Sequence, residues 1–184
     1  MQVLLRKASV RILPSSFFLS SLSNTVGGAI FHDGNLLPGD AFRCGEAGHM
    51  TLIPDGKPCY CGKTGCVDAY CSARLLSDLS GGRLEDFFLG LQQNNPDYRS
   101  VWDTYLKHLA VVINNLHMIL DYDIVLGGYV GSFLSPWLDT IRRLVAEHNT
   151  FEDDGSFVKL CTYQTGAAAY GAAMDVMEEF LRTV

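Results

Sequence analysis

The sequence lacks the features that mark several large classes of protein. Twenty acidic against fourteen basic residues leave a net charge of −6, which excludes the basic footprint of a nucleic-acid-binding chain. No apolar run approaches the roughly 18 residues that a transmembrane helix needs. Six cysteines in 184 residues are too few for a disulfide scaffold, so their spacing matters more than their number. With 48% apolar and 18% charged residues, the composition is that of a folded domain with a real core.

The N-terminal residues show little of a targeting signal. Pro14 and several serines interrupt any apolar core before residue 23, and no clear small-residue cleavage site follows. A secretory signal is the disfavoured alternative. We expect instead a strand at 17–22 in a chain that stays in the reducing cytoplasm, without membrane contact.

Hydrophobic periodicity predicts an α/β domain with a mixed sheet. Strands are expected at 17–22, 26–31, 124–126 and 157–161, and helices at 67–79, 84–91, 98–120, 135–148 and 166–183. The longest helix carries the strongest signal, an apolar stripe at helical spacing: Val101, Tyr105, Leu109, Val112, Leu116 and Ile119, widened by Trp102, Leu106, Ile113 and Leu120. The alternation of strands with helices indicates the α/β class.

Four residues with metal-ligand chemistry stand in the pattern H-x9-C-x-C-x4-C: His49, Cys59, Cys61 and Cys66. Three thiolates and one imidazole are a donor set of structural zinc sites, in which protein ligands take all four positions. The alternatives are a disulfide or plain buried thiols, which a cytoplasmic location and the awkward C-x-C spacing disfavour. The other cysteines are predicted to be small core residues: Cys44, Cys71 and Cys161.

Two linked motifs give the sequence a resemblance to the ROK family of bacterial sugar kinases and sugar-responsive transcriptional repressors. Residues 45–50 read G-E-A-G-H-M and residues 59–68 read C-Y-C-G-K-T-G-C-V-D. They resemble the family motifs G-E-x-G-H and C-x-C-G-x-x-G-C-x-E, and the similarity extends from about residue 22 to the C-terminus.

The resemblance implies one lobe of an actin-like (ribonuclease H-like) ATPase fold, with a mixed sheet, flanking helices and a structural zinc loop. Residues 22–184 would form the C-terminal sugar and zinc lobe, with the zinc loop at 45–68. Residues 1–21 would be an atypical N-terminal segment, and we expect the first lobe to be missing.

The resemblance also assigns sugar contacts to Glu46, His49 and Asp68. The family glutamate that corresponds to Glu46 hydrogen-bonds sugar hydroxyls, and the histidine that corresponds to His49 both reaches toward the sugar and ligates zinc. For Glu46 by itself, an ordinary solvated loop acid is the alternative. Asp68 stands where the family usually has glutamate and is one methylene shorter, so the resemblance does not name the sugar.

Four glycines resemble nucleotide-binding positions of the family. Gly127 and Gly128 follow an expected strand, as does the family turn that approaches adenosine, although a plain strand–helix turn explains them equally well. Gly27 and Gly28 lie in the stretch that corresponds to the phosphate-binding hairpin of family kinases. Several hairpin glycines are replaced within 23–30, which weakens the expectation of phosphate binding.

The acidic residues that phosphoryl transfer would need are absent from residues 1–21, which contain neither aspartate nor glutamate. A family kinase has an N-terminal D-x-G-x-T motif and an aspartate as general base upstream of the hairpin, so we assign no catalytic residue in this chain. The preferred prediction is the sugar-recognising, zinc-containing lobe of a ROK-type transcriptional regulator, which would reach DNA through an upstream domain. The alternative is the C-terminal half of an ATP-dependent hexose or amino-sugar kinase, with ATP and magnesium bound once the missing lobe is supplied. A fragment without activity is the third possibility.

The closing helix supports an expectation about assembly. In the family this helix crosses back to the first lobe, so Val176, Phe180 and Leu181 would lack their packing partner. Exposed apolar side chains favour association, and we therefore expect a homo-oligomer.

Overall fold

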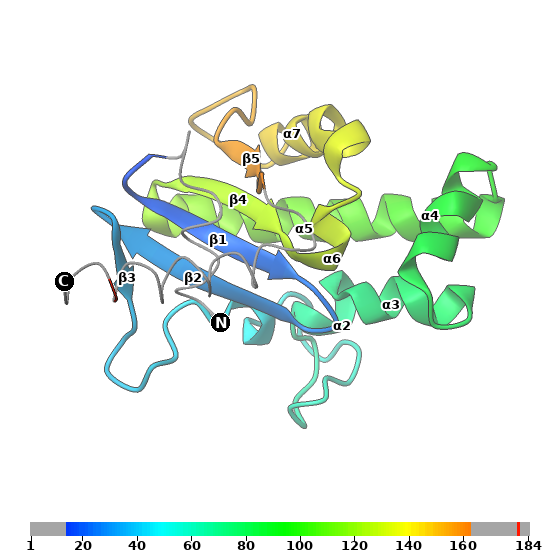
Figure 1. Ribbon diagram of the computed structural model, residues 1–184, viewed down its shortest axis with the longest axis horizontal. Helices are drawn as coiled ribbons and strands as arrows, with labels where there is room; N and C mark the ends of the chain where they lie inside the picture. The colour runs from blue at the N-terminus through cyan, green and yellow to red at the C-terminus, as the bar shows by residue number, and fades with distance from the viewer. Residues whose placement is uncertain (1–13, 163–179, 181–184) are drawn as a thin grey trace.

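The computed structural model of the protein describes residues 14–162 and residue 180. The described residues form a mixed five-stranded sheet in the order β3-β2-β1-β4-β5 (Figure 1). Its strands are β1 (Phe17–Leu22), β2 (Val26–His32), β3 (Asn35–Leu37), β4 (Asp123–Gly127) and β5 (Val158–Leu160). β1 pairs antiparallel with β2 and parallel with β4, so the predicted mixed sheet is confirmed.

β1 lies at the centre of the sheet, and all six of its residues are buried. Phe18 and Leu22 belong to the main core, whereas Phe17 and Leu19 belong to a smaller cluster of buried residues. Burial on both faces explains why this strand reads as a nearly continuous apolar run. The sheet therefore includes residues 17–21, which the sequence analysis placed in a separate N-terminal segment.

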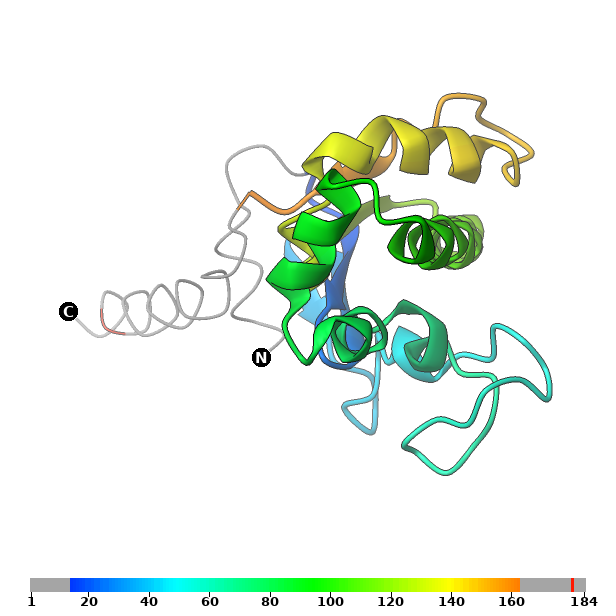
Figure 2. The same ribbon diagram turned by 90° about the vertical axis from the view of Figure 1, so that its right-hand side faces the viewer.

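The described helices lie on one side of the sheet (Figure 2). They are α2 (Asp68–Cys71), α3 (Ala73–Ser77), α4 (Leu84–Gln92), α5 (Pro96–Leu120), α6 (Gly128–Gly131) and α7 (Leu138–Ala146). Among the described residues, no helix has both the length and the apolar character needed to cross a membrane.

The long helix α5 is confirmed, and its ends have clear causes. The side chain of Asn95 accepts hydrogen bonds from the backbone of Asp97 and Tyr98, and Pro96 occupies the first turn. Asp121 ends the helix in the left-handed conformation. The prediction that Ile119 belongs to the buried face of α5 is wrong, because this residue is 74% exposed. The buried face is centred instead on Trp102, Leu106 and Ile113.

Two predicted helices differ from the structure. The helix expected at 67–79 is interrupted at Ser72, which is extended, and the following Ala73 N–H donates to the carbonyl oxygen of Ser23 at 2.7 Å. The helix expected at 135–148 begins as a 3₁₀ turn, Ser135–Trp137, before α7. The interruption at Ser72 comes from a contact with a distant part of the chain, which local periodicity does not report.

The helix predicted at 166–183 lies outside the described residues, except for Phe180, whose side chain is 65% exposed. Val176 and Leu181 also lie outside them. The expected homo-oligomer therefore stays a prediction.

Candidate functional site

The G-E-x-G-H segment packs directly on the backbone of β2. Its 3₁₀ turn, Ala47–His49, lies so close to this strand that a Cβ atom on Gly48 would overlap the Val26 carbonyl oxygen. Glycine permits this approach because it has no side chain. The motif thereby places Glu46 and His49 beside the β1–β2 hairpin.

The cysteine-bearing segment forms a compact loop next to this turn. The N–H of Cys59 donates to Lys63 at 2.8 Å, and the N–H of Gly62 donates back to Cys59 at 3.0 Å. Cys66 forms a β-bridge with Thr51, and the N–H of Val67 donates to Met50 at 2.9 Å. These bonds tie the loop to the segment that carries His49.

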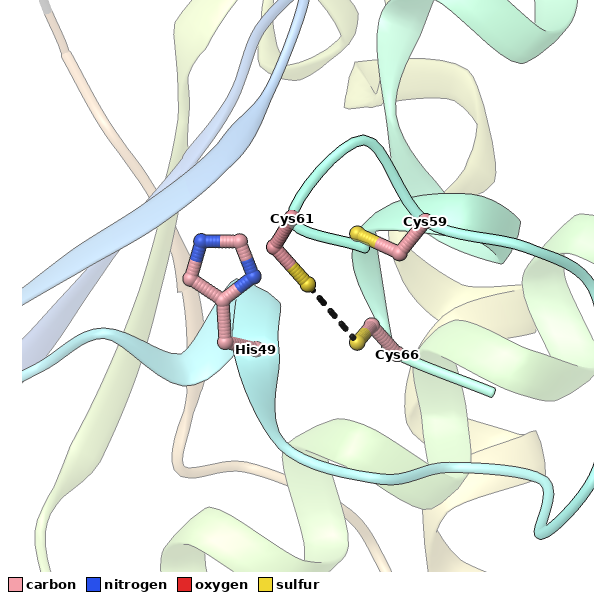
Figure 3. Close-up of side chains that lie close together, drawn as sticks. All are labelled: His49, Cys59, Cys61 and Cys66. Atoms are coloured by element: carbon pink, nitrogen blue, oxygen red, sulfur yellow. Dashed lines mark hydrogen bonds between the residues drawn. The ribbon is translucent and has the colours of Figure 1, made fainter. Parts of the chain in front are cut away.

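The structure brings together all four predicted metal ligands (Figure 3). One ligand atom from each of His49, Cys59, Cys61 and Cys66 lies within 4.8 Å of the others. The Sγ atoms of Cys61 and Cys66 are 3.7 Å apart, well beyond the roughly 2.05 Å of a disulfide bond. A tetrahedron with bonds of about 2.3 Å from zinc to sulfur has edges of about 3.8 Å. The four residues therefore fit a metal ion of the zinc type.

The electrostatics of the cluster also suit a cation. Burial raises the pKa of the Cys66 thiol to about 12. A backbone hydrogen bond from Lys63 is the main cause that lowers the pKa of Cys61. Without a metal, the proton therefore stays on Cys66 at neutral pH, and a bound cation would replace it.

The sequence analysis missed Tyr60, which lies between two of the cysteines. Its Oη atom is 3.1 Å from Nε2 of His49, and the two rings meet edge to face with centroids 5.3 Å apart. Figure 3 shows that the other ring nitrogen of His49 faces the sulfur atoms. Tyr60 stands at a variable position of the family motif, so the pattern contains no signal for it.

A cavity of about 600 Å³ opens between the hairpin, the cysteine loop and helices α2 and α3. Its lining includes Asn24, Thr25, Lys57, Cys59, Tyr60, Asp68, Ser72 and Arg74. Of the three predicted sugar contacts, Asp68 lines this cavity directly. Burial is the largest cause that raises the pKa of Tyr60, and the charges of Asp68, Cys59 and Glu46 add to it. His49 lies next to the cavity through its contact with Tyr60, and the N–H of His49 donates to the carbonyl oxygen of Glu46 at 3.1 Å, so Glu46 belongs to the same turn.

Asp68 has a second partner, which the sequence did not predict. It is 6% exposed, and its Oδ1 atom accepts a hydrogen bond from the N–H of Val26 at 2.6 Å. Hydrogen bonds to a carboxylate are stronger than neutral ones, so Asp68 holds the first residue of β2, next to the hairpin turn. One carboxylate oxygen is therefore engaged in the fold, which leaves the other for a ligand.

The four glycines with predicted nucleotide contacts have different surroundings. A Cβ atom on Gly28 would overlap the ring of Phe18, and one on Gly128, whose φ is +83°, would lie 2.7 Å from Leu22 N. A Cβ on Gly27 would meet nothing within 4 Å, and one on Gly127 would lie 3.2 Å from Cys161. Packing therefore accounts for Gly28 and Gly128 without a nucleotide.

A second cavity of about 200 Å³ lies beside Gly128 and is lined by Asn24, Ala73, Ser77, Leu84, Glu85, Tyr129 and Phe133, among others. Asn24, at the tip of the β1–β2 hairpin, lines both cavities. Asn24 therefore lies between a cavity beside the cysteine loop and a second one that Tyr129 and Phe133 line after β4.

Sequence comparison finds relatives with named activities. The chain is 29% identical over 162 residues to an N-acetylmannosamine kinase of Salmonella typhi, a match that covers 84% of this chain and 54% of that protein. It is 28% identical over 193 residues to a glucokinase of Halalkalibacterium halodurans, with coverage of 89% and 57%. The chain thus spans about half the length of these relatives.

Solved structures share the fold. A ROK family glucokinase from Streptomyces griseus in complex with glucose and AMPPNP gives a TM-score of 0.70 at 21% identity, covering 87% of this chain and 60% of that one. A ROK family transcriptional regulator, a homolog of the E. coli MLC protein, also gives 0.70 at 21% identity, covering 86% and 45%. These neighbours confirm the predicted fold class.

The family model of the ROK family matches residues 14–179, which is most of the chain. The match includes both the G-E-x-G-H turn and the cysteine loop, whose residues the structure brings together around one point. This chain belongs to the ROK family.

Proposed function

We propose that this chain is the sugar-recognising lobe of a larger ROK protein. The observation that carries the proposal is the cavity of about 600 Å³ beside the cysteine loop, which Asp68 lines and beside which His49 lies through its contact with Tyr60. Carboxylates accept hydrogen bonds from sugar hydroxyls, and an imidazole fixed by a metal keeps its orientation. The proposed sugar contacts are therefore Glu46, His49 and Asp68.

The proposed role of the metal is structural. A zinc ion held by His49, Cys59, Cys61 and Cys66 would leave no position for substrate, because four protein ligands complete its usual tetrahedron. When bound, it would supply rigidity to one wall of the cavity. Cys59, which also lines the cavity, connects the metal centre to the sugar site.

Calorimetric titration with glucose and N-acetylmannosamine, the sugars that the relatives' names suggest, tests the sugar site. Glu46→Ala should weaken the binding of whichever sugar the parent binds by about tenfold or more, because a hydrogen bond to a charged group contributes about 1.5–3 kcal/mol. Glu147→Ala, which removes an exposed glutamate of the distant α7 end, is the matched control. Unchanged affinity in Glu46→Ala would contradict the assignment.

The regulator role is favoured by the hairpin. Ser23, Thr25 and Ala29 stand where the kinase hairpin has glycine. The N–H of Val26 is engaged by Asp68. A backbone N–H that already donates within the fold is not available to a phosphate. In this role the sugar would act as an effector, and contact with DNA would come from an upstream domain.

A kinase is the second candidate, and the relatives favour it, since both sequence relatives described above are named as sugar kinases. In that role ATP and magnesium would act together with another lobe that supplies the general base. The second cavity beside Gly128 would then take part of the nucleotide. The residues encoded upstream separate the candidates, because D-x-G-x-T marks a kinase and a helix-turn-helix marks a regulator.

A further inference from the structure

We infer that Ser72 is a ligand-contacting residue of the cavity of about 600 Å³, in which its hydroxyl forms a hydrogen bond with a hydroxyl group of the sugar. The two family motifs end at residue 68 and do not include Ser72. The inference deepens the proposed function and rests on it.

Ser72 is a buried residue whose hydroxyl the fold does not use. It is 6% exposed and occupies the N-cap position of α3. A serine at this position usually accepts a hydrogen bond from a backbone N–H of the first helical turn. The Ser72 side chain makes no such bond, and its hydroxyl has no other partner among the described residues. A buried hydroxyl without a partner is costly, which indicates that a molecule bound beside it completes its bonding.

The hydroxyl of Ser72 opens onto the cavity. Among the described residues, the buried side-chain atoms that are sealed from solvent and lack a partner are Trp102 Nε1, Asn114 Oδ1 and Asn149 Nδ2. The Ser72 oxygen also lacks a partner but is not one of these sealed atoms, so part of its surface is open. The open space that Ser72 lines is the cavity of about 600 Å³. Its hydroxyl is therefore within reach of a ligand there.

The backbone holds Ser72 beside Asp68, one of the proposed sugar contacts. Asp68 begins α2 and Ser72 directly follows this helix, so the two residues share one face of a helical turn, and both line the cavity. The N–H of Ser72 donates to the Asp68 carbonyl oxygen at 3.3 Å. The N–H of Ala73 donates to Ser23 at 2.7 Å, which ties this point to the β1–β2 hairpin (Figure 1). A polar group that is ordered before binding loses less conformational entropy when the ligand arrives.

The other side chains of the cavity define the class of ligand. Its lining includes two cationic and two acidic side chains: Lys57, Arg74, Asp68 and Asp78. Arg74 lies 3.7 Å from Asp78, and Lys57 Nζ lies 5.3 Å from the centre of the Tyr70 ring. Neither sign of charge is in excess, and both donors and acceptors are present. A sugar carries several hydroxyl groups that each donate and accept, so a polyhydroxylated ring fits this lining, and the Ser72 hydroxyl suits one of its hydroxyls.

The test compares the parent with Ser72→Ala by calorimetric titration of glucose and N-acetylmannosamine. Loss of one neutral hydrogen bond should weaken the binding of the preferred sugar by about threefold to tenfold. The thermal midpoint of sugar-free Ser72→Ala should not fall, because the hydroxyl caps no helix. Ser100→Ala is the matched control and should bind as the parent does, since Ser100 is an exposed serine of α5 that lines neither cavity.

Unchanged sugar binding by Ser72→Ala, together with weaker binding by Glu46→Ala, would overturn the inference while the proposed function stands. A lower thermal midpoint of sugar-free Ser72→Ala would show that the hydroxyl serves the fold, which also overturns the inference. A parent chain that binds neither sugar would overturn the proposed function together with the inference.

Discussion

At the scale of single residues, His117 of α5 is a buried titratable side chain outside the candidate site. Its Nδ1 atom is 2.8 Å from the Tyr122 carbonyl oxygen, and its Nε2 atom is 3.1 Å from a carboxylate oxygen of Glu152. The ring also stacks on Phe157 with centroids 3.6 Å apart. Both partners are acceptors, so both nitrogens must donate for both bonds to form. This one side chain joins the end of α5 to the segment that leads into β5.

We predict that His117→Ala lowers the free energy of unfolding by about 2–4 kcal/mol, because it leaves a cavity and removes the partner of the partly buried Tyr122 carbonyl. Urea denaturation followed by circular dichroism measures this change. His148→Ala, at an exposed position, should change stability by less than about 0.5 kcal/mol. A loss below about 1 kcal/mol in His117→Ala would show that the segment is held by other contacts.

At the scale of elements, the strands were easier to predict than the contacts that position the site. The strands at 17–22 and 26–31 were identified from short apolar runs and turn residues, and both are present, the second longer by one residue. The break at Ser72 was not predicted, because its cause is a hydrogen bond from Ala73 to Ser23, far away in the sequence. The β1–β2 hairpin, the G-E-x-G-H turn and the cysteine loop thus contact one another, and these contacts set their positions.

The contact between the turn and the hairpin can be tested at Gly48. We predict that Gly48→Ala lowers stability by about 1–3 kcal/mol and weakens metal binding, since the added Cβ would push the His49 turn away from Val26. Gly27→Ala is the control, because a Cβ there meets no atom within 4 Å. Chemical denaturation and zinc competition with a chromogenic chelator measure the two effects. Equal stability and equal zinc affinity of the two variants would mean that the turn can move away from Val26 without loss of either.

At the scale of the whole molecule, the four candidate metal ligands lie in a loop and turn outside the main core. The core is formed by the sheet, α4, α5 and their neighbours, with Trp102 among its largest fully buried side chains. The cysteine loop at 59–66 contains no aliphatic side chain, so we expect metal binding to supply much of its local stability.

We predict about one zinc per chain by elemental analysis, retained in Cys44→Ser and lost in Cys66→Ser, since Cys44 is not among the four ligands. Chelation should lower the thermal midpoint, and acidification should release the metal. Protons and zinc compete for the cysteine thiolates, so metal affinity should fall as the pH falls. Burial raises the pKa of the metal-free Cys66 thiol to about 12, which favours the proton in this competition. Metal-free protein with unchanged thermal stability would contradict this prediction.

The sequence by itself determined the α/β class, the family and the four residues that the structure brings together as a candidate metal site, because these depend on residue type and short spacing. The resemblance also identified Glu46, His49 and Asp68 as candidates, although their roles remain proposals. The tertiary structure alone decided that Asp68 holds Val26, that Tyr60 bonds His49 and that Ile119 is exposed. Asp68 and Val26 are 42 residues apart, and local patterns carry no information about such pairs. The physical reason is that periodicity reports which face of an element is apolar, whereas partners across the fold depend on how the elements pack.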